Sequence, residues 1–302
     1  MSVSDGSPDV LVANRRSGIS VRPLRAFARF SRRSPVGAVA VGIILALSVM
    51  AIVGPHVAPF DPEKIGAGPK YLAPSFGENL LGTDQLGRDV LSRILHGTWI
   101  TLLVGVVAST GGTMVGAIMG LASGYWGGRT DALIQRIVDI LMAFPVLILA
   151  MALLAALDRS LNTLLFAIAV PFIPYGARVV RATTLVIKEA QYVDAARAIG
   201  ASDLRIIMHH IAPGCLAPYL VVLTGLVGVA IITESALGFL GLGIPPPTPT
   251  WGEMLSKGVE LSFFAPVVAI VPGVFITLAV FSFGTVGDAL RDVLDPRLRG
   301  RT

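Results

Sequence analysis

Residues 192–218 read YVDAARAIGASDLRIIMHHIAPGCLAP, a polar stretch that separates two long hydrophobic runs. The run from Ala190 to Ile199 predicts a helix, since its alanines are strong helix formers and neither Gly nor Pro interrupts it. Gly200 is the expected stop, because glycine readily adopts the left-handed conformation that closes helices. A second short helix is expected from an N-cap at Ser202 to an end at Pro213. A helix with so little side-chain bulk suits a groove on a partner protein.

The composition around this stretch indicates a polytopic membrane protein. Of the 302 residues, 54% are hydrophobic and 14% are charged, whereas soluble domains carry about 25% charged residues. The first hydrophobic run begins near Val36, behind a long basic tail, and further runs follow it, which does not fit a secretory signal peptide. The single cysteine, Cys215, excludes an intrachain disulfide.

Six hydrophobic runs predict six transmembrane helices and an all-α fold, because each run crosses most of a hydrocarbon core about 30 Å thick. The expected spans are residues 36–53, 100–123, 132–157, 161–180, 216–242 and 263–284. Pro55 is expected to end the first span and Pro145 to bend the third. In the second span, Gly112, Gly116 and Gly120 recur every four residues, which predicts close packing against another helix.

Basic residues set the expected topology. Seven arginines in residues 1–34 and the basic loop at 178–215 should lie on one side of the membrane, which the positive-inside rule makes the cytoplasm. The expected domains are a cytoplasmic tail (1–34), a first helix with an external segment (35–99), a five-helix core with a cytoplasmic loop at 184–215 (100–288), and a cytoplasmic tail (289–302). A nucleic-acid-binding arm is the alternative for the first tail, but its place beside a span favours the topological role.

Five segments resemble motifs of one protein family. The segment DAARAIG at 194–200 is similar to the cytoplasmic Glu-Ala-Ala loop of inner-membrane permease subunits of binding-protein-dependent ABC importers. Asp194 departs from the Glu of that motif, which keeps the charge on a shorter side chain. The other four segments resemble the dipeptide and oligopeptide branch of the family; they are LGTDQLGRDVLSR at 81–93, ESALGFLGLG at 234–243, PPTPTWG at 246–252 and GDALRDVLDPR at 287–297.

The resemblance implies the transmembrane domain of a type I ABC importer. This chain would pair with a second, similar permease as a heterodimer, with two ATP-binding subunits or one fused ATPase below and an extracytoplasmic solute-binding protein above. The ATPase subunits would bind ATP and Mg, and this chain would bind no cofactor and no metal. The setting would be the lipid of the bacterial inner membrane. The substrate would be a dipeptide or longer peptide, with nickel and glutathione as alternatives.

The same resemblance identifies the polar loop as the coupling element that docks on the ATPase. Its candidate contact residues are Asp194, Ala195, Ala196, Ala198, Gly200, Ala201 and Asp203. The sequence contains no Gly-x-x-x-x-Gly-Lys-Ser/Thr phosphate loop, so this chain is not expected to hydrolyse ATP itself. No Ser/His/Asp order typical of a hydrolase stands out, so the chain is not expected to be an enzyme.

Ionisable residues in or beside the spans are further candidates. Glu234 is the one charge deep in a span, and a lipid-facing carboxylate costs about 2.5–3.5 kcal/mol on insertion scales. We therefore expect it to face protein or a water-filled path, where it would line the pathway or hold the two permease subunits together. Arg136 and Asp139 are three residues apart and are expected to pair along their helix, in preference to a proton relay. The candidates at the external rim are Asp84, Arg88, Asp89, Arg93 and Trp251, of which the four charged residues are expected to pair among themselves.

Two other functions are less well supported by the sequence. A secondary transporter driven by ions would need ionisable or unwound sites near the membrane midplane, where the sequence offers only Glu234. An intramembrane hydrolase would need paired catalytic groups within the spans, and none are found. His209 and His210 are adjacent and do not share a helix face, which argues against a metal site there.

Overall fold

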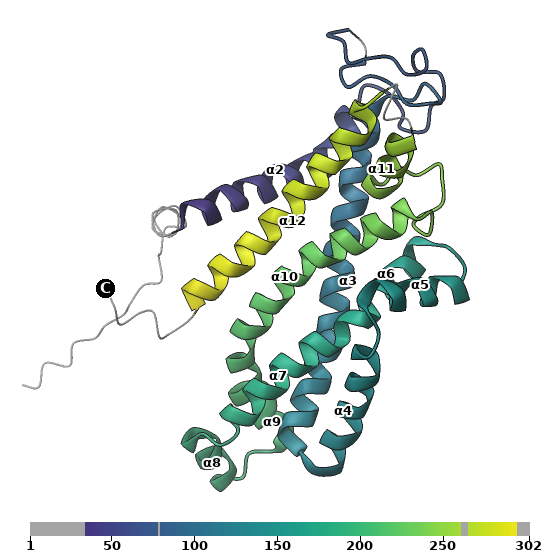
Figure 1. Ribbon diagram of the computed structural model, residues 1–302. Coiled ribbons are helices and arrows are strands. Elements are labelled where there is room, and N and C mark those ends of the chain that lie inside the picture. Colours follow the sequence, from purple (N-terminus) through teal and green to yellow (C-terminus); the bar gives the residue numbers. More distant parts are fainter. Residues whose placement is uncertain (1–33, 78, 261–264, 295–302) are drawn as a thin grey trace, which may run out of the picture.

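The computed structural model describes residues 34–77, 79–260 and 265–294, and the regular elements within these ranges are all helices (Figure 1). They are α2 (Pro35–Val57), α3 (Val90–Trp126), α4 (Gly128–Met142), α5 (Val146–Ala156), α6 (Leu161–Ala169), η1 (Val170–Phe172), α7 (Ile173–Ile187), α8 (Gln191–Ala198), α9 (Asp203–Ile206), η2 (Ile207–Ile211), α10 (Ala212–Phe239), α11 (Trp251–Glu260) and α12 (Val267–Leu294). The predicted all-α class is confirmed. The expectations for the arginine-rich tail and for residues 295–302 lie outside the described residues.

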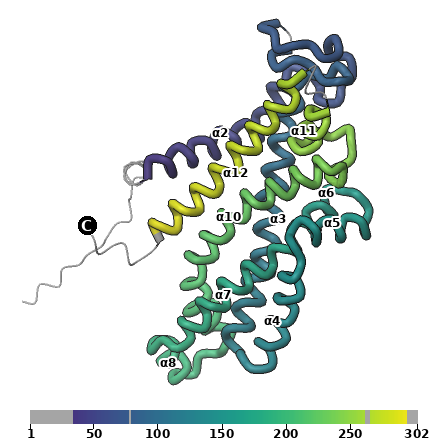
Figure 2. Tube along the Cα trace, viewed as in Figure 1, coloured from purple at the N-terminus to yellow at the C-terminus, as the bar shows by residue number. Residues whose placement is uncertain are grey.

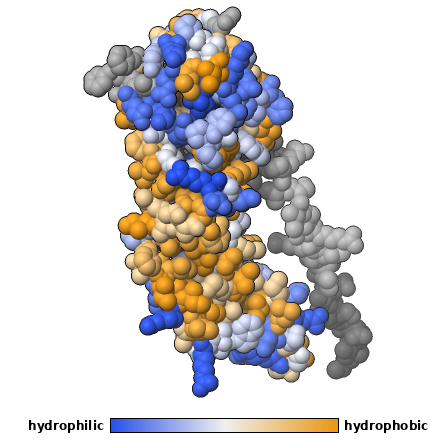
Figure 3. Space-filling model, turned by 90° about the vertical axis from the view of Figure 1, so that its right-hand side faces the viewer, coloured by the Kyte–Doolittle hydropathy of each residue, from blue (hydrophilic) through white to orange (hydrophobic). Residues whose placement is uncertain are grey.

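Five helical segments are long and apolar enough to cross a membrane, and the bent pair α4 and α5 would make a sixth span. The expected six spans are therefore reached if these two helices, which meet at 90°, are one broken span. Figure 3 shows a broad hydrophobic band between more hydrophilic ends of the molecule. The non-helical residues 58–77 and 79–89 and the loop that carries α8 lie at opposite ends of the bundle (Figure 2).

The centre of the bundle is α3, which packs most extensively against α7. Glycines allow this approach, since a Cβ atom at Gly116 would lie 2.0 Å from the carbonyl oxygen of Ile173. From the other side, a Cβ atom at Gly176 would lie 2.2 Å from the carbonyl oxygen of Thr113. The predicted close packing is confirmed, and the two backbones touch with no side chain between them.

Two prolines act differently from expectation. α2 continues past Pro55 to Val57, so this proline does not end the helix. The bend expected at Pro145 is present, since α4 and α5 meet there at 90°, and it is sharp enough to divide the segment into two helices. Pro213 does not end the second helix of the polar loop, because α9 runs through the π-helical turn η2 into α10. That wider turn ends at Ile211, two residues before Pro213, which is where a residue without an N–H is expected to disturb the helical hydrogen bonds.

Candidate functional site

The polar loop forms a compact turn between α8 and α9 at one end of the bundle (Figure 1). α8 closes where Gly200 takes a φ of +80°. The backbone N–H of Gly200 donates to the carbonyl of Arg197 at 2.9 Å, and that of Ala201 donates to the carbonyl of Ala196 at 3.1 Å. This pair of bonds is the Schellman arrangement, which satisfies the last carbonyls of a helix. The expected stop at Gly200 is confirmed, whereas Ser202 precedes α9 without a side-chain cap bond.

The exposed surface of this turn differs from the expected contact set. Of the coupling candidates, the exposed ones are Asp194, Ala195, Ala198, Gly200 and Asp203, and Ala201 is half-buried. Ala196 is only 5% exposed and packs with Val193 and Ile206 in the core of the loop. Ile199 and Leu204 are 86% and 71% exposed, although sequence reasoning did not single them out. The signal that could have identified them is that both are large apolar residues within a polar segment. Their exposure adds apolar side chains to the surface that the turn presents.

The two acidic candidates of the turn already have partners within the chain. Asp194 Oδ1 lies 3.2 Å from Arg197 Nη1 on an exposed face. Asp203 Oδ1 accepts a 2.6 Å hydrogen bond from the hydroxyl of Tyr125, in the last turn of α3. Asp203 is therefore held against the bundle, while Asp194 is the freer of the two to meet a partner protein.

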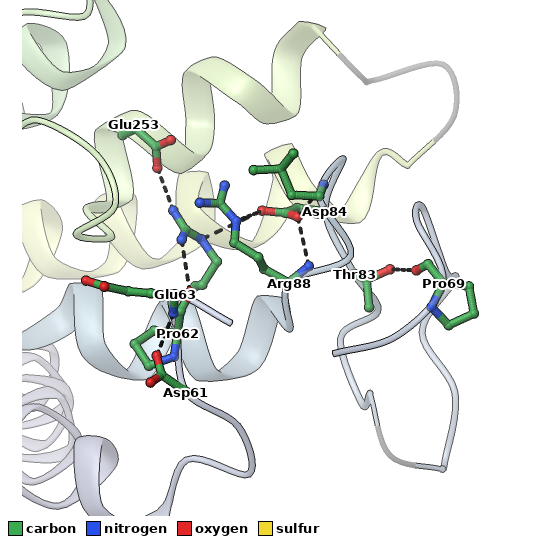
Figure 4. Close-up of polar contacts among 10 residues, drawn as sticks. Asp61, Pro62, Glu63, Pro69, Thr83, Asp84, Arg88 and Glu253 are labelled. Carbon is green, nitrogen blue, oxygen red and sulfur yellow. Dashed lines mark hydrogen bonds and ion pairs between the residues drawn. The ribbon is translucent and has the colours of Figure 1, made fainter. Parts of the chain in front are cut away.

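Three of the four charged residues expected at the external rim form a buried ion cluster with Glu253, whereas Asp89, contrary to expectation, does not join it (Figure 4). Arg88 Nε lies 2.6 Å from Asp84 Oδ2, and Arg93 Nε lies 3.9 Å from the same oxygen. Arg93 Nη2 binds Glu253 Oε2 on α11 at 2.8 Å, and Arg93 Nη1 donates to the carbonyl of Pro62 at 3.1 Å. The cluster ties the start of α3 to α11 and to the non-helical external segment. Sequence reasoning missed Glu253 because 160 residues separate it from Arg93.

Two of the rim candidates do not take part in ion pairs of the described residues. Asp89 accepts hydrogen bonds from the backbone N–H of Ser92 at 2.7 Å and from Asn79 Nδ2 at 2.9 Å. It therefore caps α3, which begins earlier in the chain than expected. Trp251 is fully buried at the start of α11, with its ring centroid 5.6 Å from that of Phe275. It lies in the core beneath the rim, because α11 turns its first residues inward.

Glu234 lies inside this chain, where α10 packs against α3. Its side chain is fully buried, and its Oε2 accepts from Thr101 Oγ1 and Ser235 Oγ, each at 3.3 Å. Its Oε1 has no hydrogen-bond partner among the described residues. The expected shielding from lipid is thus provided by this chain, while a place on the pathway or at a subunit contact stays a prediction. Within the described ranges, no group of three His, Cys, Asp or Glu side chains could hold a metal ion.

The charges of α4 pair with α7. Asp139 Oδ1 lies 2.9 Å from Arg178 Nη2, and Asp131 forms a bidentate pair with Arg181 in which both bonds are 2.6 Å long. The expected pair of Arg136 with Asp139 is wrong, because α4 packs against α7 and the arginines of that helix reach its carboxylates. Arg136 is exposed.

The break between α4 and α5 leaves backbone polar groups inside a candidate span. Pro145 has no N–H to donate to the carbonyl of Leu141, one turn earlier. A pocket of about 300 Å³ lies at the break, lined by residues 141–146 together with Pro171 and Tyr175. Irregular backbone inside a membrane is tolerated where protein buries it or where it lines a water-filled space. The break is therefore a candidate wall of an aqueous path.

Comparison with known proteins finds similar sequences along most of the chain. Residues 112–300 match the family model described as binding-protein-dependent transport system inner membrane component, and residues 23–74 match the N-terminal transmembrane domain of oligopeptide transport permease C. A putative peptide transport system permease protein of Brucella suis is 42% identical over 261 residues, covering 86% of this chain and 88% of that protein. A glutathione transport system permease protein of Pectobacterium atrosepticum is 40% identical over 287 residues, covering 93% of each chain.

Among solved structures, the methionine ABC transporter MetNI in inward-facing conformations resembles this chain with a TM-score of 0.54 and 20% sequence identity. The likeness covers 67% of this chain and 97% of that chain. At this identity it shows the fold alone, which is the membrane domain of an ABC importer.

Proposed function

This chain belongs to the family of inner membrane components of binding-protein-dependent transport systems, and we propose that it is the permease subunit of an ATP-driven peptide importer. The observation that carries the proposal is the exposed α8–α9 turn at the end of a membrane bundle, where a separate ATPase can act on it. The sequence supplies this turn and contains no phosphate loop. The chain would form half of the translocation pathway, with the break at Pro145 on its wall, and couple ATP hydrolysis to alternating access.

The family implies three kinds of partner, namely a further permease, an ATPase and a binding protein. We assign the further permease as a similar but distinct chain, so that the two form a heterodimer. Two ATP-binding subunits or one fused ATPase would hold ATP and Mg and would meet Asp194, Ile199 and Leu204. The solute-binding protein would meet the opposite end, where the segment at 58–89 lies. This chain is then a non-catalytic subunit of the complex.

Peptide is the substrate class that the relatives favour, since one is a putative peptide permease and the N-terminal match is to an oligopeptide permease. Glutathione is itself a tripeptide and is the second candidate. Uptake of a labelled dipeptide by a deletion strain carrying this chain should be inhibited by unlabelled peptides and not by nickel. Uptake that is independent of the chain, or that only nickel inhibits, would contradict a peptide permease.

We propose that both termini and the α8–α9 turn are cytoplasmic and that the segment at 58–89 is external, which keeps the expected domain boundaries. In a chain whose buried Cys215 is replaced by alanine, Ser75→Cys should react with a membrane-impermeant thiol reagent in intact spheroplasts. Ser202→Cys should react only after permeabilisation. Both serines are exposed, so labelling reports their side of the membrane. The opposite pattern would rule out this orientation.

Gly200→Val is expected to uncouple the transporter without preventing membrane insertion. Valine at a φ of +80° should add strain of about 1–3 kcal/mol. No atom of the described residues lies within 4 Å of a Cβ built at Gly200, so the strain stays in the backbone of the turn. Co-purification of the ATPase, hydrolysis stimulated by the binding protein, and uptake should all fall while the protein level stays normal.

The matched control is Gly200→Asn, because asparagine tolerates the left-handed conformation far better than valine. It should retain most of the coupling that Gly200→Val loses. Wild-type values for Gly200→Val in all three measurements would show that this turn is not the coupling element.

A further inference from the structure

α3 differs from every other candidate span in having no proline. The other spans contain or are broken at prolines 35, 55, 145, 171, 174, 213, 218 and 272. Proline is a leading cause of sharp bends in helices, so α3 runs from end to end without the breaks that proline makes in the other spans. Its 37 residues extend about 56 Å at 1.5 Å per residue. It runs between the two ends of the bundle, from the external segment to the end that carries the α8–α9 turn (Figure 1).

The last turn of α3 is bonded to both helices of the polar loop through one side chain. The Tyr125 hydroxyl donates to Asp203 Oδ1 at 2.6 Å, at the start of α9. The guanidinium carbon of Arg197, near the end of α8, lies 5.8 Å from the centroid of the Tyr125 ring, within the range of a cation–π contact. Arg197 in turn pairs with Asp194 at 3.2 Å. The loop is thus joined to α3 by side chains, in addition to its covalent connections to α7 and α10.

The other end of α3 is joined to a neighbouring helix by a buried ion pair. Arg93, in the first turn of α3, binds Glu253 of α11 at 2.8 Å and is fully buried. Between the two ends, the glycine contacts hold α3 against the backbone of α7. A displacement of the α8–α9 turn that moves Tyr125 therefore acts on a continuous helix whose other end carries Arg93.

We propose that Tyr125 is a positioning residue that transmits displacement of the α8–α9 turn to α3, which acts as a rigid strut towards the external end. This inference rests on the proposed function, because it assigns to the turn the motion that an ATPase imposes. A contact can shift a conformational equilibrium only if it differs between the two states. The Tyr125–Asp203 bond is suited to that role, because it joins elements that come together only through tertiary structure.

The test is Tyr125→Phe in the complete complex, reconstituted with its ATPase and binding protein. This variant removes one hydroxyl and keeps the ring beneath Arg197. Co-purification of the ATPase and the melting temperature should match wild type. Uptake per ATP hydrolysed should fall by roughly 5-fold or more, the lower range of measured coupling between sites. A residue that only supports the fold would change the melting temperature and leave this ratio unchanged.

The Asp203 variants separate the bond from other roles of that carboxylate. Asp203→Asn keeps an acceptor oxygen and should retain most of the coupling, whereas Asp203→Ala should reproduce Tyr125→Phe. The double variant Tyr125→Phe/Asp203→Ala should be no worse than either single variant, since both remove one bond. Tyr219→Phe, which loses a hydroxyl contact to Thr113 at 3.2 Å away from the turn, should couple normally.

Each contrary result has a distinct meaning. A wild-type ratio of uptake to hydrolysis in Tyr125→Phe, or additive losses in the double variant, would overturn the role of Tyr125 and leave the proposed function standing. Failure of any ATPase to co-purify with the wild-type chain would overturn the proposed function, and this inference with it.

Discussion

Gly116→Ala is expected to lower the yield and the melting temperature of the folded chain sharply. The added Cβ atom would lie 2.0 Å from the carbonyl oxygen of Ile173 and 2.8 Å from the backbone N of Ala177, and neither atom can move without moving α7. Overpacking of this kind costs about 1–3 kcal/mol and occasionally more. In the purified permease, size-exclusion profiles and thermal unfolding in detergent measure the loss.

The matched control is Gly111→Ala, five residues earlier on the same helix. A Cβ atom there meets no atom of the described residues within 4 Å. Since alanine is the better helix former by about 1 kcal/mol, this variant should be neutral or slightly stabilising. Gly120→Ala should fall between the two, because its Cβ atom would lie 2.5 Å from the carbonyl oxygen of Ala177. Equal stability of the Gly116 and Gly111 variants would contradict direct backbone contact between α3 and α7.

Arg93→Met is expected to be the most damaging of the charge substitutions. It leaves Glu253 without its partner in a site where the Arg93 and Glu253 side chains are 2% and 14% exposed. Removing one member of a buried ion pair costs about 3–5 kcal/mol, because the remaining charge keeps its desolvation penalty. The start of α3 also loses its bond to the carbonyl of Pro62. Thermal unfolding of the detergent-solubilised chain should show the loss, and the external segment should become more sensitive to protease.

Two further variants test whether the loss comes from the buried charge that Arg93→Met leaves unpaired. Arg178→Met breaks an ion pair whose side chains are 50% and 61% exposed, and it should change the free energy of unfolding by about 0–1 kcal/mol. The double variant Arg93→Met/Glu253→Leu removes both buried charges and should recover part of the loss, because apolar replacements often substitute for buried pairs. An Arg93→Met chain as stable as Arg178→Met would show that the cluster does not hold α3 to α11.

The sequence by itself determined the fold class, the coarse arrangement of spans and the position of the polar turn. Inside hydrocarbon, every backbone donor and acceptor must be satisfied within the segment, so a long apolar run specifies a helix almost independently of its neighbours. The stop at Gly200 is likewise local, because it depends on the absence of a Cβ atom at one position. The spacing of Gly112, Gly116 and Gly120 identified a packing face without identifying its partner, α7.

Only the tertiary structure decided which charged residue meets which. Arg136 is three residues from Asp139 in the sequence, yet Asp139 pairs with Arg178 of another helix. Arg93 likewise pairs with Glu253, which is 160 residues away in the sequence. Tertiary packing likewise buried Ala196 within α8 and exposed Ile199 at the C-cap of the same helix. Ion pairs and burial depend on distances between elements, which the packing of whole helices sets. Sequence spacing fixes such distances only within one or two turns of a helix, which is why the turn itself was predictable and its bond to Tyr125 was not.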